Sequence, residues 1–299
     1  MAVQSLHTCV FYTNAEVAEI LVEGKEAIGV RLSNGTTLHA PTIISDAGVA
    51  LTLGHLLPAK VAKSSGLLKK LAKVGPSLAH ISLYLGLDKS TEELGLQKPN
   101  LWVYQDENHD ANVARHLSDP SAPLPVAYIS FPSAKDPSFA ERFPDKATIE
   151  VVSASSYEWF EEWENTKWNK RGEEYEAKKE KITEELLAIL YEQCPQVKGH
   201  IVHSELSTPL STKKFAAHPR GEIYGLAHTP ARFEERWLRP HTPIKGLYLT
   251  GADICSAGIG GALMGGVITV SAILKKNMRG IIATSAREIY HRKVTAKQT

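Results

Sequence analysis

The chain has 299 residues, enough for one large domain or two smaller ones with a substantial core. Its formal net charge is +1 at pH 7, and its lysines and arginines are dispersed along the sequence. A protein with a net charge this close to zero has no strong electrostatic field to attract a polyanion, so we expect no nucleic-acid partner. The three cysteines, Cys9, Cys194 and Cys255, lie far apart without metal-type spacing, so we also expect no metal site.

Apolar segments give no sign of a signal peptide or a transmembrane helix. The most apolar stretch, residues 259–274, is rich in glycine and too short to span a bilayer, so it predicts a buried helix. We therefore expect a cytoplasmic protein, with peripheral contact with a membrane left open. The sequence does not determine the oligomeric state.

Strands are predicted near the start of the chain, over residues 17–22 and 27–32. The dipeptide Asn34-Gly35 between apolar runs predicts a tight hairpin to a further strand. Residues 41–46 predict a strand buried on both faces that ends at Asp46, at a junction of the kind that faces a ligand. A basic, partly helical segment over residues 60–75 then leads to the next region.

The middle of the chain predicts a second sheet. Residues 77–87 alternate with a period of two, with Ile81 and Leu83 on one side and His80 and Tyr84 on the other. Further strands are expected over residues 126–131 and 148–153. Residues 155–194 are expected to be mostly helical with a break near Gly172, with Trp159 and Trp163 sharing a helix face and a second apolar stripe at Ile182, Leu186, Ile189 and Leu190.

The most informative segment is residues 246–274. It predicts a short buried strand, then the turn Gly251-Ala252-Asp253, then a helix that starts among glycines. This order places a carboxylate just past a strand end and leaves backbone N–H groups uncovered at a helix N-terminus. Such a site suits a phosphate or the electron-rich edge of a flavin. The alternative is that the glycines serve close packing and that Asp253 is an N-cap. No G-x-G-x-x-G fingerprint is present.

Residues 205–230 read as a loop with four polar side chains, His218, Arg220, Tyr224 and His228. An arginine can hold a phosphate or carboxylate, and a tyrosine or histidine can supply a proton. The alternative is that each of these side chains hydrogen-bonds the loop backbone. No hydrolase triad order and no zinc motif appears in the sequence.

Three stretches together resemble a known family. TPLSTKKF, HPRGEIYGLAHTP and LYLTGADICSAGIGGALMGG are similar to the C-terminal half of the phytoene desaturase-related flavoenzymes, nearest to all-trans-retinol 13,14-reductase and the carotenoid isomerases. The resemblance implies an FAD-dependent oxidoreductase that reduces, desaturates or isomerises a C=C bond of an apolar polyene of the retinoid or carotenoid type. NAD(P)H is a candidate electron donor.

The resemblance also implies site residues, carried over by position. Asp253, after Gly251, would bind the ribityl chain, and Gly260, Gly261 and Ala262 would offer N–H groups to the isoalloxazine. Val17 would lie in the strand that meets the adenine. Tyr224 and His228 are the candidate catalytic residues. The candidate substrate-binding residues are Tyr84, His218 and Arg220.

One departure from the family bears on activity. Family members begin with a strand, G-x-G-x-x-G, a helix and an acidic residue that hold the FAD diphosphate and ribose, and this sequence lacks that segment. We therefore expect a fragment of a longer enzyme, or else a non-catalytic truncated polyene-binding protein. An amine oxidase of the same fold would need an aromatic cage near Gly251, and few aromatic residues lie there.

The predicted fold class is α/β. A partial Rossmann-like FAD-binding domain without its N-terminal βαβ unit would be formed discontinuously by residues 1–60 and 236–280. A mixed-sheet and helix substrate domain would occupy residues 76–235. The C-terminal tail, residues 281–299, is expected to fray.

Overall fold

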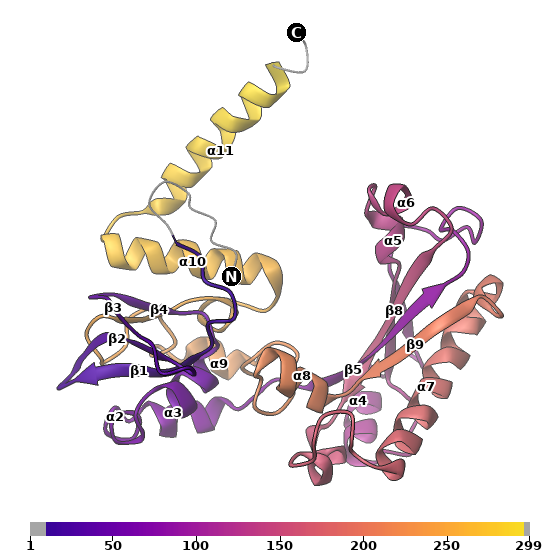
Figure 1. The fold of residues 1–299 in the computed structure, drawn as a ribbon, viewed down its shortest axis with the longest axis horizontal. Coiled ribbons are helices and arrows are strands. Elements are labelled where there is room, and N and C mark those ends of the chain that lie inside the picture. Colours follow the sequence, from indigo (N-terminus) through magenta and orange to yellow (C-terminus); the bar gives the residue numbers. More distant parts are fainter. Residues whose placement is uncertain (1–9, 296–299) are drawn as a thin grey trace. The chain divides into compact units, whose positions relative to one another are not determined.

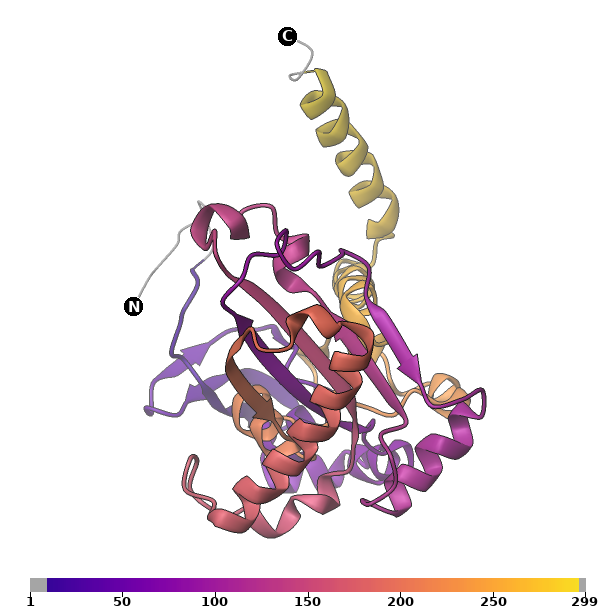
Figure 2. The same ribbon diagram turned by 90° about the vertical axis from the view of Figure 1, so that its right-hand side faces the viewer.

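The computed structural model describes residues 10–295, so Cys9 lies outside it. The chain divides into two compact units: residues up to Ser77 together with those from Tyr224 onward form the first, and Leu78–Ile223 form the second. The chain therefore leaves the first unit once and returns to it. Figures 1 and 2 trace this order by colour.

The first unit contains two small sheets. β1 (Val17–Glu23), β2 (Glu26–Leu32) and β3 (Thr37–His39) form an antiparallel sheet in that order. The predicted hairpin is confirmed, and its Gly35 has φ of 87°, a conformation that glycine adopts without strain. β4 (Ile43–Ser45) and β10 (Leu247–Leu249) pair in parallel, although about two hundred residues separate them in sequence.

Helices and one core cluster complete the first unit. Its core includes Ile20, Leu53, Leu226 and Leu247, all essentially inaccessible to solvent. The helical elements are α1 (Val49–Leu51), the π-helix η1 (Thr52–Leu56), α2 (Ala59–Ser64), α3 (Leu67–Val74), α9 (Pro230–Glu234), the 3-10 turn η5 (Ala252–Ile254), α10 (Gly258–Leu274) and α11 (Met278–Thr295).

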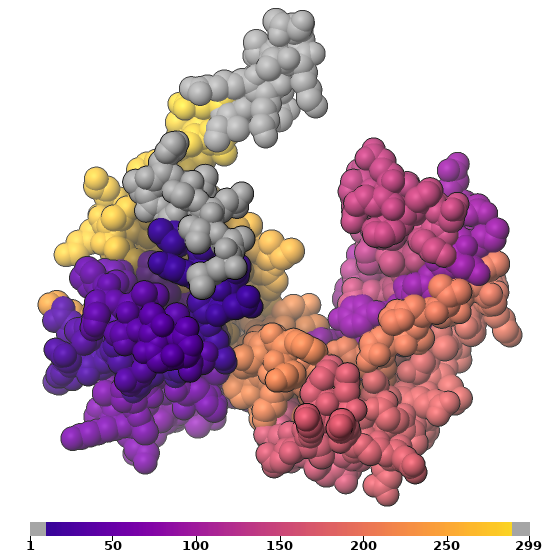
Figure 3. All heavy atoms as spheres, in the orientation of Figure 1, coloured from indigo at the N-terminus to yellow at the C-terminus, as the bar shows by residue number. Residues whose placement is uncertain are grey.

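Helix α10 forms as predicted, but the prediction that it is buried is wrong. Ile259 is 83% exposed and Leu263 68% exposed, and part of the helix is visible at the surface in Figure 3. The helix packs instead through Gly261, Gly265 and Thr269, which share one face because they are four residues apart. The contact is too close for large side chains, so these point away from it. Within residues 10–295, no helix is both long and apolar enough to cross a membrane.

Two other expectations for the first unit differ from the structure. Ile44 in β4 is 49% exposed, so this strand is not buried on both faces. This two-stranded sheet is covered on one face only, so Ile44, which points to the other face, lies in solvent. The expected frayed tail instead begins as helix α11, since residues after Asn277 include good helix formers such as Ala286, Arg287 and Glu288.

The second unit is built on a five-stranded antiparallel sheet in the order β6-β7-β8-β5-β9. Its strands are β6 (Leu101–Tyr104), β7 (Val126–Ser130), β8 (Ala147–Ser155), β5 (Ala79–Leu87) and β9 (Ile201–Ser207). Its helical elements are α4 (His109–Ser118), α5 (Pro132–Lys135), α6 (Phe139–Arg142), η2 (Tyr157–Trp159), η3 (Glu161–Trp163), α7 (Glu173–Gln193), η4 (Pro195–Val197) and α8 (Pro209–Ala216).

The sheet has one covered and one open face. Ile81, Leu83 and Leu85 of β5 pack into a core with Leu186 and Leu190 of α7, which crosses the sheet in Figure 2. The predicted alternation of β5 and the apolar stripe of α7 are therefore confirmed. The alternate positions form the open face, where Tyr84 and Trp102 are largely exposed.

Two local predictions for the second unit are wrong. Residues 155–171 hold only the short 3-10 turns η2 and η3, so Trp159 and Trp163 do not share one continuous helix face. The segment 205–230, expected to be a loop, contains the end of β9 and helix α8. Thr208 and Pro209 start α8, and Ser211 Oγ accepts a hydrogen bond from Thr208 N at 3.2 Å.

Candidate functional site

The candidate cofactor site lies in the first unit, where two parallel strands end side by side. β4 runs into Asp46 and β10 runs into Gly251 and Asp253, and the two strands pair in register up to Ser45 and Leu249. The carboxyl ends of parallel strands are where open α/β sheets bind ligands. The structure thus brings the two strand ends that the sequence singled out to the same edge of one sheet.

Asp253 joins three segments of the chain at this edge. Its side chain is buried, and Oδ2 accepts a hydrogen bond from Val49 N at 2.8 Å while Oδ1 accepts one from Leu226 N at 2.9 Å. Both oxygens therefore fasten backbone from distant parts of the sequence. Each carboxylate oxygen retains a second lone pair, which is free to accept a hydrogen bond from a ribityl hydroxyl. That contact stays a prediction.

Two glycines allow this close approach of carboxylates to backbone. A Cβ at Gly225, where φ is 68°, would lie 2.5 Å from Asp253 Oδ1. At Gly251, where φ is 86°, a Cβ would overlap Asp46. Burial raises the pKa of Asp46, with the nearby charge of Asp253 as a second cause. The edge thus holds two neighbouring carboxyl groups over glycine backbone.

Arg232 places an unsatisfied cation beside the carboxylates. The guanidinium is buried, and Nη2 donates to the carbonyl oxygens of Asp253 at 2.8 Å and Ala252 at 3.2 Å. Its Nε and Nη1 have no partner among residues 10–295. Burial lowers the pKa of Arg232, and the charge of Asp253 opposes that shift. Two buried donors of a charged group without acceptors are unusual in a native protein and suit an electron-rich ligand.

His228 and Tyr224, the predicted catalytic residues, lie close together in the same unit. Their ring centroids are 6.5 Å apart, and Tyr224 is 48% exposed. Both ring nitrogens of His228 are buried and find no partner in the described part of the chain. Burial, with the charge of Arg232, lowers the pKa of His228, so its imidazole is neutral at pH 7. A neutral imidazole offers one donor and one acceptor.

The start of α10 presents the remaining predicted cofactor residues. The helix begins at Gly258, and no described side chain caps it. Gly260 is exposed with open space where a side chain would be, and Ala262 is half-buried. Gly261 instead packs against Ser256, so it serves the local fold as well. The first N–H groups of this helix thus have no intrahelical partner and remain available.

Val17, predicted to lie near an adenine, is the first residue of β1 and pairs with Leu32 of β2. It packs against the core of the first unit. Its predicted role at an adenine stays a prediction.

The predicted substrate residues lie in the second unit, and the structure brings two of the three together. Tyr84 and His218 both line a pocket of about 590 Å³, which we call the β5–β9 pocket, with walls from β5, β9 and α8. Arg220 lies elsewhere, where it pairs with Glu158 and Glu161. Its guanidinium also stacks on Tyr157 at 4.7 Å, so its charge is already engaged outside the β5–β9 pocket.

Sequence reasoning missed Arg232 and His80. Arg232 follows a Thr-Pro helix start, and nothing in that local pattern marks it as buried. His80 was placed on the open side of its strand, but the sequence does not show that α8 closes a pocket around it.

Comparison with known proteins decides the relationship. No family model matches the chain. All-trans-retinol 13,14-reductase of Rattus norvegicus is 38% identical over 277 residues, which are 89% of this chain and 46% of that protein. The chain is a relative of the all-trans-retinol 13,14-reductases. The resemblance predicted from the motifs is thereby confirmed.

A more distant match is a carotenoid-modifying protein, a prolycopene isomerase. The chloroplastic prolycopene isomerase of Daucus carota is 28% identical over 256 residues, which are 82% of this chain and 37% of that protein. The chain thus spans less than half the length of the curated relatives it matches.

A solved oxidoreductase structure from Methanosarcina mazei is similar to this chain in fold. The match covers 89% of this chain and 50% of that chain, with a TM-score of 0.52 and 18% identity, and it supports the mixed α/β fold.

Proposed function

We propose that the chain forms the flavin-facing part of an FAD-dependent oxidoreductase that reduces, desaturates or isomerises a C=C bond of a retinoid or carotenoid polyene. Its relation to a retinol reductase and a prolycopene isomerase supports an apolar polyene as substrate. NAD(P)H as electron donor and peripheral contact with a membrane belong to the same proposal.

The observation that carries the cofactor part is the buried Arg232. Its Nε and Nη1 lack acceptors among the described residues, and the two ring nitrogens of the adjacent His228, one a donor and one an acceptor, also lack partners there. They lie in the same unit as the uncapped start of α10 at Gly258. These donors fit the electron-rich edge of an isoalloxazine or the oxygens of a phosphate, which would satisfy buried groups that otherwise destabilise the fold.

In this proposal each residue has a distinct task. Bound FAD would supply the hydride-transferring ring. Asp253 keeps the loops at Val49 and Leu226 in place, and the first turn of α10 offers its free N–H groups to the cofactor. Tyr224 or His228 would deliver a proton to the substrate, since the two rings are held beside one another.

The proposal assigns only part of a flavin site to this sequence. A G-x-G-x-x-G segment for the diphosphate is absent from the given residues, and the curated relatives are about twice as long as the matched region. We therefore propose that the given chain is a fragment of a longer enzyme, with diphosphate contacts supplied by residues outside it.

The first test is a titration of the purified chain with FAD, followed by flavin fluorescence. Gly260→Val places a side chain in open space at the start of α10, and we expect it to weaken FAD binding at least tenfold. Gly266→Val is the matched control because its Cβ also meets nothing within 4 Å, but farther along the same helix. Equal affinity of the two variants would contradict a flavin at the helix start.

The second test follows the chemistry. Reduced flavin bound to the chain is mixed anaerobically with all-trans-retinol, and we expect flavin reoxidation together with loss of polyene absorbance. Polyene binding by a chain that binds no flavin would instead support the non-catalytic alternative.

A further inference from the structure

The β5–β9 pocket in the second unit combines aromatic side chains with a few polar ones. It lies on the open face of the sheet, between strands β5 and β9 and helix α8, and its volume of about 590 Å³ falls within the range of small-molecule sites. Trp168 and Phe215 form one wall, in edge-to-face contact with ring centroids 4.8 Å apart. Such aromatic walls provide contact area for an apolar body.

The polar lining of the pocket suits a neutral ligand. None of the described residues that line it is a lysine or arginine. Its one acidic side chain, Glu205, already pairs with Lys179 at 3.1 Å. An anionic ligand would therefore enter without a counter-charge, which opposes binding.

Among the described residues that line this pocket, His80 is the one with a buried side-chain atom that lacks a hydrogen-bond partner. No described residue hydrogen-bonds its imidazole, and Nδ1 is fully buried. Burial lowers the pKa of His80, with His218 as a second cause, so the ring is neutral at pH 7. Because the imidazole lines the pocket and Nδ1 is enclosed, Nε2 is the nitrogen left for a ligand. A hydroxyl group both donates and accepts, so it can pair with either tautomer.

We propose that the β5–β9 pocket binds the hydroxyl end of a polyene alcohol, with His80 as its hydrogen-bond partner and the Trp168–Phe215 pair against its apolar body. The choice of a polyene rests on the function proposed above. The pocket and the unpartnered histidine do not depend on it.

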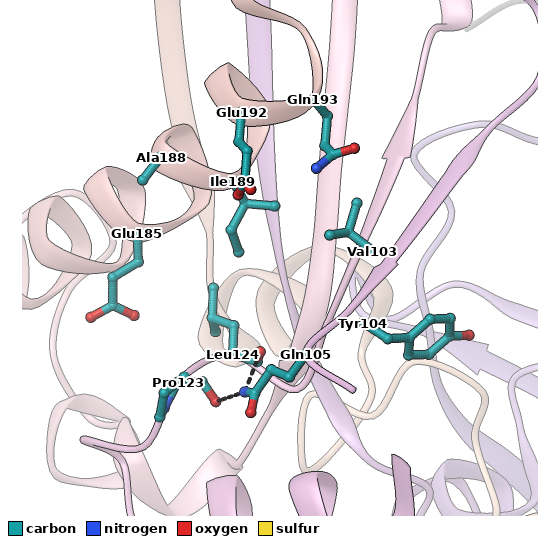
Figure 4. Close-up of a pocket in the computed structure, with 10 residues that line it drawn as sticks. All are labelled: Val103, Tyr104, Gln105, Pro123, Leu124, Glu185, Ala188, Ile189, Glu192 and Gln193. Carbon is teal, nitrogen blue, oxygen red and sulfur yellow. Dashed lines mark hydrogen bonds between the residues drawn. The ribbon is translucent and has the colours of Figure 1, made fainter. Parts of the chain in front are cut away.

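Two other hollows of the second unit fit such a ligand less well. The pocket in Figure 4, which we call the α7 pocket, has about 550 Å³ but is rimmed by Glu185 and Glu192, and its Gln105 already donates to Pro123 and Leu124. The hollow beside His116 has only about 210 Å³, below the usual range for such ligands.

The test is a fluorescence titration of the full chain with all-trans-retinol. His80→Leu removes the hydrogen bond at similar volume, and we expect the dissociation constant to rise about tenfold. Since His80 has no protein partner to lose, we expect the variant to unfold at the same temperature as the wild type or higher. His203→Leu, an exposed position on the same sheet face outside the pocket, is the control and should bind normally.

A second pair of variants locates the ligand. Ala216→Trp fills the β5–β9 pocket from the end of α8, and Ala188→Trp fills the α7 pocket from an equally exposed helical position. We expect only Ala216→Trp to abolish binding. Unchanged affinity of both His80→Leu and Ala216→Trp, loss of binding only in Ala188→Trp, or no retinol binding by the wild-type chain would each overturn the proposal.

These outcomes separate this proposal from the proposed function. Retinol binding that depends on His80, in a chain that neither binds FAD nor turns over retinol, would support the pocket and contradict the enzyme. Turnover that is insensitive to His80→Leu and Ala216→Trp would support the enzyme and contradict the pocket.

Discussion

Helix α7 of the second unit and helix α10 of the first place their apolar side chains in opposite ways. In the second unit, Leu83 and Leu190 meet between a five-stranded sheet and α7 and are fully buried. In the first unit, α10 has its glycines inside and Ile259 and Leu263 outside. An apolar helix can therefore serve either as core or as surface, depending on which of its residues are small enough for the closest contact.

Asp253→Ala tests how far the first unit depends on one side chain. We expect a loss of about 4 kcal/mol in the free energy of unfolding of this unit, because two buried N–H groups lose their acceptor and the buried Arg232 loses a nearby opposite charge. Hydrogen exchange should accelerate around Val49 and Leu226 and stay unchanged in β5 and β8. Asp253→Asn retains one acceptor oxygen and should lose about half as much. If hydrogen exchange accelerated equally in both units, the expectation that Asp253 stabilises only the first unit would be contradicted.

Alanine substitutions compare the two apolar surfaces directly. Leu83→Ala should cost about 3 kcal/mol in urea unfolding, because it opens a cavity in a sealed core. Leu263→Ala should cost less than about 0.5 kcal/mol, since that side chain is already in solvent. A large loss for Leu263→Ala would show that another surface covers α10 in solution.

Glycine substitutions separate backbone strain from crowding within the first unit. Gly225→Ala should destabilise by about 3 kcal/mol because it adds a clash with Asp253 to the strain of a positive φ. Gly35→Ala has a similar φ but open space around the new Cβ, so about 1 kcal/mol is expected. Thermal unfolding of both variants measures the difference, and equal losses would argue against crowding.

The smallest effect is a pH dependence at Asp46. Its folded-state pKa is raised above the ordinary value of 3.8, so the stability contributed by its protonated form is complete below that value and is lost as pH rises through the folded pKa. Asp46→Asn removes this loss. We expect the variant to melt above the wild type at neutral pH and level with it in acid. If the difference in melting temperature between the variant and the wild type grew in acid instead, the prediction would be contradicted.

Much of the fold was predictable because its patterns are local. The hairpin at Gly35 and the alternation of β5 follow from neighbouring residues, and each forms as expected. The helix α8 was missed because the polar residues after Glu205 masked its Thr-Pro start. The exposure of α10 could not be read from hydropathy, since it depends on how closely Gly265 approaches Gly251.

The candidate site was predictable to the extent that strand ends mark it. The positions of Asp46 and Asp253 at neighbouring strand ends followed from the sequence. Burial of Arg232 and closure of the pocket around His80 depend on segments far away in the chain, so no local pattern reveals them. Arg220 was placed among the substrate residues because an arginine can hold a phosphate or carboxylate, and its pairing with Glu158 is a long-range contact that no local pattern reveals.

The bond between Val49 and Asp253 joins residues 204 positions apart, and this has a consequence for the order of folding. During synthesis, residues 78–223 are complete before Asp253 leaves the ribosome, and their strand pairs are already within reach of one another. Strand β4, by contrast, must wait for β10 to arrive as its partner. The unit that contains β4 is therefore completed only after the second unit, although β4 itself is made earlier.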